Sequence, residues 1–255
     1  MKRFANPRSV IALRITTCLL AAGLSAASSR FARAGVLEGI GGWEGDTRAQ
    51  GYGFATLGAL IPASQRTIIP VRVTASYLYY HYDSTAITLK VRSPGVSLVT
   101  GVRVSGTRGS ITALAGGEVR WERRAPDVGG APSYDQTIGG FVGQWENDLV
   151  LARRWHGQLL ASYGGAAQYV YCRGALRYQV SNLSWNRPVS LFCGLEAVRQ
   201  GNRDSNGLQA GAFLESSLVP QHVSLGLHGG YKENWSAGLP HATGGYLGLG
   251  VYRSY

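Results

Sequence analysis

Two side chains near the C-terminal end of the chain could act as a nucleophile and its base. His222 and Ser224 stand two positions apart, which would place both on one face of an extended strand. The imidazole could then accept the proton of the hydroxyl while a carboxylate such as Glu215 orients the ring, as in barrel enzymes that modify membrane lipids. The His-x-Ser pattern also arises by chance, and His222 directly follows a tight Pro220-Gln221 turn. We therefore expect both residues to be structural and the protein not to be an enzyme.

Two cysteines remain once the N-terminal segment is set aside. Cys172 and Cys193 lie on consecutive predicted strands, share the apolar parity and are symmetric about a turn near residues 182–183. In an oxidising compartment they could form a disulfide, or they could be two independent small side chains that face an apolar environment. The sequence has no His/Cys spacing for a metal, no glycine-rich phosphate loop and no Gly-x-Ser-x-Gly elbow. We therefore expect no metal and no cofactor.

A set of charged residues alternates with apolar ones along much of the chain. If the apolar faces contact lipid, the following side chains project into the interior of a barrel: Arg72, Lys90, Arg92, Arg103, Glu118, Arg120, Glu122, Arg173, Arg177, Glu196, Glu215, His228 and Lys232. Charges in such an interior must be paired or hydrated. We favour ion pairs that fill a narrow lumen, with Arg173 and Arg177 facing Glu196, over a polar path for a sugar or an ion.

The elements that carry these residues follow a period of two. From Val71 to His81 the odd positions are mostly apolar, and similar alternation recurs to the C-terminus, as is typical of strands with one apolar face. In the fourth strand the apolar parity changes at Ser93-Pro94-Gly95, which predicts a bulge that reverses the faces. The sequence predicts strands at residues 36–45, 51–61, 67–82, 86–104, 110–123, 136–151, 154–164, 167–180, 188–200, 206–219, 222–232 and 242–254.

Composition separates a barrel from other folds. Glycine makes up 36 of the 255 residues and charged residues only 15%, and each glycine inside a helix costs about 1 kcal/mol relative to alanine. After the N-terminal segment, no stretch reaches the roughly 18 apolar residues of a spanning helix, whereas several predicted strands exceed the about 9 to 11 residues that cross a bilayer at a tilt. We predict an all-β fold, an antiparallel up-and-down transmembrane barrel of about 12 strands.

The N-terminal residues are typical of a secretory signal peptide. Basic residues precede the apolar run at 15–24, and Ala32-Arg33-Ala34 offers a small-residue cleavage motif. We expect residues 1–34 to be the signal peptide and residues 35–255 to be the barrel. Six of the 25 basic residues and none of the 14 acidic ones lie in the signal peptide, so the net charge falls from +11 to +5 on cleavage. No basic run remains, and we expect no nucleic-acid partner.

The C-terminal strand and the connections agree with a barrel of the bacterial outer membrane. Leu247, Leu249 and Tyr255 share one parity, and outer-membrane barrels commonly end in such an amphipathic strand with a terminal aromatic residue. With an even strand number both termini lie in the periplasm, and the longer connections lie outside. The two longest predicted connections, 124–135 and 233–241, fall on that outer side. We therefore expect the chain to reside in outer-membrane lipid.

Several short motifs follow one another across about residues 50–232. They are Thr100-Gly101-Val102-Arg103, Gly139-Gly140-Phe141-Val142-Gly143 leading to Asp148-Leu149, Tyr171-Cys172-Arg173-Gly174-Ala175, Gly194-Leu195-Glu196, Gln200-Gly201-Asn202-Arg203-Asp204 and Leu208-Gln209-Ala210-Gly211-Ala212. Together they resemble the BcsS cellulose-biosynthesis family. The resemblance implies an outer-membrane barrel associated with cellulose synthesis or export, partners among cellulose synthase or secretion components or the glucan, and no catalytic residues.

The predicted function is that of an outer-membrane barrel that assists cellulose biosynthesis or export, and thereby the biofilm matrix, without catalysis. Two alternatives remain open. One is a lipid-modifying enzyme built on His222 and Ser224, and the other is a small diffusion porin with an open lumen.

Overall fold

The computed structural model describes residues 36–254 except 49, 84–87, 127–132, 186, 203–204, 219–221 and 236–240, and it describes no side chains at 82–83, 181–185 and 187–188. The predicted signal peptide lies outside the described residues. Among the residues that are described, no helix is long and apolar enough to cross a membrane.

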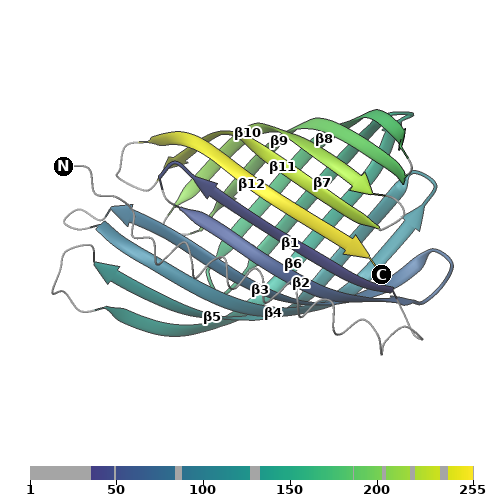
Figure 1. The fold of residues 1–255 in the computed structure, drawn as a ribbon. Helices are drawn as coiled ribbons and strands as arrows, with labels where there is room; N and C mark the ends of the chain where they lie inside the picture. The colour runs from purple at the N-terminus through teal and green to yellow at the C-terminus, as the bar shows by residue number, and fades with distance from the viewer. Residues whose placement is uncertain are drawn as a thin grey trace.

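All twelve predicted strands are present, with ends that differ by a few residues from those expected. They are β1 (Val36–Asp46), β2 (Gly51–Pro62), β3 (Thr67–Asp83), β4 (Thr88–Gly106), β5 (Gly109–Pro126), β6 (Tyr134–Ala152), β7 (Trp155–Gly164), β8 (Tyr169–Trp185), β9 (Arg187–Gly201), β10 (Asn206–Leu218), β11 (Val223–Trp235) and β12 (Ala242–Ser254). Each strand pairs antiparallel with the next, so the predicted up-and-down order is confirmed (Figure 1).

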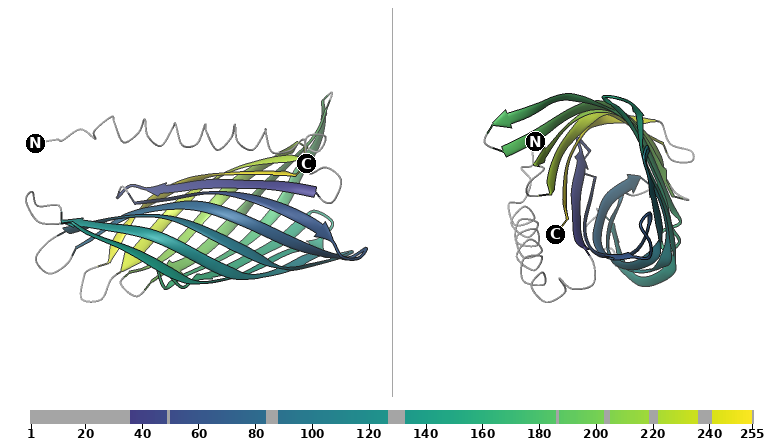
Figure 2. Two further views of the ribbon diagram at one scale, coloured as in Figure 1. Left: turned by 90° about the horizontal axis from the view of Figure 1, so that it is seen from below. Right: turned by 90° about the vertical axis from the view of Figure 1, so that its right-hand side faces the viewer.

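The sheet closes on itself because β1 pairs with β12, with Glu38 opposite Ser254. Seen along its axis, the chain forms a ring of tilted strands around an interior (Figure 2). The start of β1 and the end of β12 lie at the same end of the barrel. We call the opposite end the loop end; its connections are 47–50, 84–87, 127–133, 165–168, 202–205 and 236–241. The two longest connections, 127–133 and 236–241, are at the loop end, as predicted.

The outward face of the barrel is apolar and the inward face is largely polar. Leu195 and Leu214 are 67% and 62% exposed on the outside, whereas Glu38 and Arg72 are buried on the inside. Such a surface suits a lipid solvent and not water, because the apolar groups are turned away from the interior. Exposed outward aromatic side chains lie toward both ends, as in the aromatic girdles of membrane barrels; they include Trp43, Trp121, Tyr163 and Tyr231 toward the loop end and Trp145 and Trp155 toward the other.

The predicted bulge in the fourth strand is wrong. β4 runs without a register shift along both β3 and β5, so its faces do not reverse. Val91 is completely buried inside the barrel, and Arg92 is exposed on the outside. Lys90 and Arg92, which we expected to point inward, therefore lie on the outward face. The expectation failed because it assumed that apolar side chains face outward along the whole strand, whereas this end of β4 extends past the apolar part of the outer surface.

Register shifts occur instead between Val150 and Ala152 in β6 and between Gln179 and Ser181 in β8. After the second shift, β8 continues to Trp185, so the connection predicted at 181–187 shrinks to residue 186.

This longer hairpin separates the two cysteines. Cys172 lies opposite Arg199, and Cys193 lies opposite Tyr178. The six-residue offset along the ladder corresponds to roughly 20 Å at about 3.3 Å per residue, too far for a disulfide. Both thiols are free. Of the two interpretations left open by the sequence, the structure agrees with independent side chains on the outward face.

Candidate functional site in the barrel interior

A buried ion-pair cluster connects strands that are not neighbours. Nε of Arg72 on β3 lies 2.5 Å from Oε1 of Glu38 on β1, and its Nη1 lies 2.5 Å from Oε1 of Glu146 on β6. Arg103 on β4 places Nη2 3.8 Å from a carboxylate oxygen of each of these glutamates. Because β4 and β5 separate β3 from β6 in the sheet, the Arg72–Glu146 pair crosses part of the lumen. The side chain of Glu38 has no exposed area, so its charge depends on these partners.

A second bridge joins three further strands. Arg177 on β8 lies 3.1 Å from Glu215 on β10 and 3.5 Å from Asp148 on β6. Its guanidinium also lies 4.5 Å from the centroid of the Phe192 ring, a distance suited to a cation–π contact. One strand separates β8 from each of its two partners, so this arginine ties together strands along one side of the wall.

A third cluster surrounds Glu196 on β9. Arg173 lies 2.6 Å away, Nδ1 of His228 2.8 Å away, and the Tyr246 hydroxyl donates to the same carboxylate at 2.9 Å. The buried carboxylate therefore has partners from β8, β11 and β12. Gly248 faces the His228 ring so closely that a Cβ there would overlap it. The glycines of the inward face thus make room for large polar side chains.

Arg120 is held locally and not across the lumen. It lies 3.5 Å from Glu118, and its guanidinium donates to the side chain and the carbonyl of Ser93 on β4. Glu122, which stands two positions from Arg120, lies 2.5 Å from Arg124 and accepts from Gln136.

Most of the predicted interior set is therefore inside. Arg72, Arg103, Glu118, Arg120, Glu122, Arg173, Arg177, Glu196, Glu215, His228 and Lys232 lie on the inward parity of their strands. Arg173 meets Glu196 as expected, whereas Arg177 meets Glu215 and Asp148. Sequence reasoning missed five acidic partners, Glu38, Glu44, Asp46, Glu146 and Asp148. Their signal was parity: in each segment these acids alternate with an outward tryptophan, Trp43 or Trp145.

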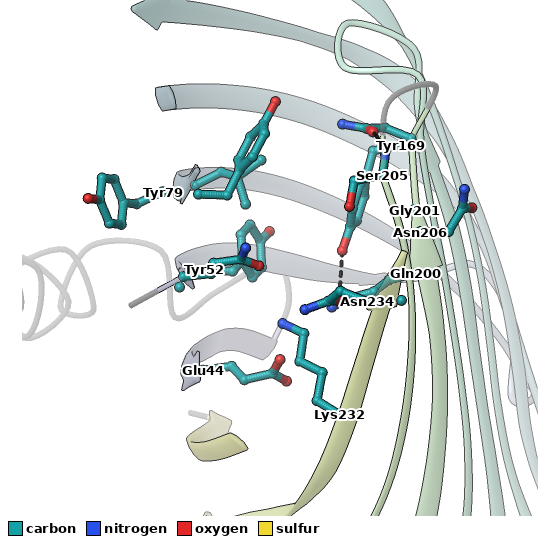
Figure 3. Close-up of a pocket in the computed structure, with 16 residues that line it drawn as sticks. Glu44, Tyr52, Tyr79, Tyr169, Gln200, Gly201, Ser205, Asn206, Lys232 and Asn234 are labelled. Atoms are coloured by element: carbon teal, nitrogen blue, oxygen red, sulfur yellow. Dashed lines mark hydrogen bonds between the residues drawn. The ribbon is translucent and has the colours of Figure 1, made fainter. Parts of the chain in front are cut away.

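The interior contains a hollow at the loop end (Figure 3). Its wall comes from seven strands and their connections and is rich in hydroxyl and amide groups; lining residues include Tyr52, Tyr80, Tyr169, Gln50, Gln200, Asn206 and Asn234. The Tyr169 hydroxyl donates to Oε1 of Gln200 at 2.6 Å, which holds the two side chains together on one wall. We call this region the mouth hollow.

The two charged groups that line the mouth hollow, Lys232 and Glu44, already have polar partners. Lys232 lies 3.0 Å from the buried carboxylate of Asp46, and Glu44 accepts from the Gln209 amide at 2.6 Å. The hollow therefore offers hydrogen bonds and aromatic surface, and its lysine is neutralised by Asp46. Amides and hydroxyls both donate and accept, which matches a neutral polyhydroxylated ligand better than an ion.

The residues of the enzyme alternative do not form a catalytic group. His222 lies exposed in the β10–β11 turn with a φ of 51°, and the Ser224 hydroxyl donates to Ser217 at 3.1 Å. Glu215, which would have oriented the imidazole, is paired with Arg177. Among the described residues there is no group of side chains arranged to hold a metal ion.

A closed sheet with an apolar outer face and a charged interior is the fold of outer-membrane β-barrels, and this chain has that fold. Similar solved structures include the translocator domain of the autotransporter NalP from Neisseria meningitidis (TM-score 0.53, 14% identity, 97% of each chain covered) and the β domain of the Bordetella autotransporter BrkA (TM-score 0.52, 10% identity, 87% of this chain and 100% of the other). The transport unit of AIDA-I from Escherichia coli is similar as well (TM-score 0.51, 13% identity, 94% and 97%). These similarities concern the fold alone.

Sequence comparison narrows the class to one family. The model of the family "cellulose biosynthesis protein BcsS" matches residues 40–255. The chain belongs to this family, which confirms the resemblance drawn from the short motifs. A search of curated proteins gave no significant match.

Proposed function

We propose that the chain acts in the bacterial outer membrane as an accessory barrel of cellulose export, and that its mouth hollow contacts the glucan. Membership of a cellulose-biosynthesis family and a fold of the outer-membrane class support this role. The apolar outer surface supports residence in lipid. The partners that we propose are cellulose synthase or secretion components, the glucan itself and outer-membrane lipid.

The observation that carries the proposal is the chemistry of the mouth hollow. Glucan chains present equatorial hydroxyl groups at their edges and C–H groups on their flat faces. Tyrosine rings such as those of Tyr52 and Tyr169 can stack on the flat faces, and amides such as Gln200 and Asn234 can bond the hydroxyls. Because Lys232 is paired with Asp46 and the Glu44 carboxylate is hydrogen-bonded to Gln209, a neutral glucan does not have to displace a strongly bound counter-ion when it enters the hollow.

The ion pairs below the hollow favour the role of an accessory barrel over that of a diffusion porin. Arg72 and Arg177 each join strands that are not neighbours in the sheet, and Arg72 is only 3% exposed. Side chains alone can fill an eight-stranded barrel, whereas barrels of 16 to 18 strands leave an aqueous channel. In a barrel of 12 strands, the side chains inside the lumen therefore decide whether it is open or closed. In this barrel these side chains are ion-paired with one another, which favours a lumen that is closed at rest.

Deleting the gene and restoring it with variants tests the proposal. Glucose released by cellulase from the extracellular material should fall in the deletion strain and recover with the parent gene. We expect Tyr169→Ala combined with Gln200→Ala to restore less, and the purified double variant to bind cellohexaose more weakly than the parent. The α-linked maltohexaose serves as the ligand control. Tyr163→Ala serves as the protein control because this tyrosine lies on the outward face near the same end.

The outcomes separate the two parts of the proposal. Unchanged extracellular cellulose in the deletion strain would contradict the accessory role. A loss on deletion that the double variant restores fully would keep the accessory role and exclude the mouth hollow as the glucan contact.

A further inference from the structure

Two arginines face each other on the outside of the barrel, near the loop end. Arg92 on β4 and Arg123 on β5 are directly opposite in the ladder, and both are exposed on the outward face. On the next rung of the outward face, Lys90 lies opposite His81. We call Arg92, Arg123 and Lys90 the rim cluster. Like charges placed directly opposite in a sheet destabilise the pair, because their Cβ atoms are only about 4.5–5.5 Å apart.

The carboxylates nearby do not resolve this repulsion. Arg123 lies 3.6 Å from Asp135, but the two side chains are 61% and 68% exposed, where ion pairs contribute little. Arg92 has Tyr79 as its other cross-strand neighbour, so neither position opposite it holds an acid. The two arginines of the rim cluster therefore have one described carboxylate beside them, Asp135, and that carboxylate is exposed.

The rim cluster begins where the apolar part of the outer surface ends. On β5, the outward positions from Ile111 to Trp121 carry no charge, and Arg123 follows as the next outward position. On β4, the outward positions from Val104 back to Pro94 carry no charge, and Arg92 follows. Each stretch spans the roughly 9–11 residues that a tilted strand needs to cross the hydrocarbon. A charge on the lipid face costs most at the midplane and little at the interface, so this placement corresponds to the headgroup level.

We propose that the rim cluster binds the phosphate groups of lipid A in the outer leaflet. The loop end is the outer side of a barrel whose two termini lie in the periplasm, and there the headgroups carry phosphates on a glycolipid. Arginine pairs with phosphate through two parallel hydrogen bonds, and one phosphate between Arg92 and Arg123 would convert their repulsion into attraction. The exposed Trp121, on the membrane side of Arg123, would rest at the headgroup boundary. This inference uses the proposed membrane location and is independent of the role in cellulose export.

Thermal unfolding of the barrel in defined vesicles tests the proposal. Phosphatidylcholine vesicles would contain no lipid A, lipid A with both phosphates, or lipid A from which the phosphates have been removed. Phosphorylated lipid A should raise the unfolding temperature of the parent, and dephosphorylated lipid A should not. In R92Q/R123Q the shift should disappear, and lipid A retained per barrel in detergent should fall at least about tenfold, the factor that corresponds to roughly 1.4 kcal/mol.

Without lipid A, we expect the same variant to lose no stability. Because R92Q/R123Q removes a like-charge pair, it should be as stable as the parent or more stable in pure phosphatidylcholine. The control R66Q/R108Q removes the same charge from two turns at the terminal end, and it should keep the lipid A effect. If R92Q/R123Q does not fold, the single variant R92Q and the phosphorylated-against-dephosphorylated comparison on the parent provide the test.

Three results would overturn the inference. R92Q/R123Q could retain the full lipid A shift, or it could be destabilised equally in every lipid, which would indicate a structural role. Inorganic phosphate could stabilise the parent as much as phosphorylated lipid A does, which would exclude a lipid headgroup as the specific ligand.

Discussion

Single residues of the interior depend on partners that come from distant parts of the chain. Arg72 contacts Glu38 and Glu146, residues that lie 34 and 74 positions away in the sequence. A buried carboxylate left without its cation is far more costly than an apolar side chain in the same place. The Arg72 cluster therefore stabilises the barrel only as long as each buried charge keeps its partner.

We expect Arg72→Met to destabilise the folded barrel by about 3–5 kcal/mol, the usual cost of removing one partner of a buried pair. The physical reason is that Glu38, with no exposed area, loses its nearest cation. Urea unfolding in detergent, followed by heat-modifiable mobility on gels, measures the change. Arg199→Met is the matched control on the outward face and should change stability by less than about 0.5 kcal/mol. If the double variant R72M/E38Q is as unstable as R72M, pairing is not the cause.

At the scale of elements, the tight β4–β5 hairpin requires a glycine at one position. Gly109 has a φ of 132°, and a Cβ there would overlap the backbone carbonyl of Asp148 on the neighbouring strand. Gly106, at the other side of the same turn, has open space around its Cβ position. The two glycines therefore differ in what a methyl group would meet, although they stand three residues apart.

We expect Gly109→Ala to destabilise the barrel by roughly 1–3 kcal/mol, the usual cost of a strained backbone position, and to slow its assembly. Gly106→Ala is the matched control and should have a small effect. The fraction of heat-modifiable barrel recovered after refolding into detergent measures both. Equal recovery of the two variants would contradict the interpretation of Gly109.

The register of β8 against β9 is a second property of elements that can be measured. Tyr178→Cys should form a disulfide with Cys193 on oxidation, because the two positions are directly opposite. Cys172 and Cys193 of the parent should stay reduced under the same conditions. Mobility on non-reducing gels and the number of thiols that react with maleimide after denaturation distinguish the two cases. A disulfide in the parent would mean that the hairpin turns near residue 183 and not at residue 186.

At the scale of the whole molecule, bridged charges decide whether the barrel conducts. Arg177 ties β8 to β6 and β10, and Arg173 ties β8 to β9 through Glu196. Together these contacts link much of one side of the interior wall. The mouth hollow lies above them at the loop end, so the molecule combines a polar entrance with a bridged interior.

Replacing Arg173 and Arg177 together by Ala should weaken the barrel and raise its conductance in planar bilayers. The substitution removes two large side chains from the lumen and leaves Glu215 and Asp148 without their shared cation. Arg199→Ala, on the outward face, should leave the conductance of the parent unchanged. A large, steady conductance of the unmutated protein would overturn the closed resting lumen and favour the diffusion porin.

Cell fractionation tests the location. If the N-terminal segment is a signal peptide and the barrel is inserted, the mature protein should be recovered in the outer membrane, and its mobility should shift on heating. Recovery in the soluble periplasm would contradict a membrane barrel.

Local pattern was sufficient to predict the number of strands and the face of most charged residues. Both follow from the period of two, which each segment carries by itself. The pattern failed at Lys90 and Arg92, because the end of β4 lies beyond the lipid-facing belt and apolar parity no longer marks the outside there. It also missed Glu38 and Glu146, although alternation with Trp43 and Trp145 carried the signal.

The sequence by itself therefore determined the fold class, the strand order and, through its motifs, the family. Only the tertiary structure decided which charges meet, because Arg72 and Glu146 are brought together by closure of the sheet and not by neighbouring positions. It also decided the hairpin register that separates the cysteines, the opposition of Arg92 and Arg123, and the mouth hollow. These features depend on how strands are aligned with one another, and a periodic pattern specifies the face of a residue but not its partner across the sheet.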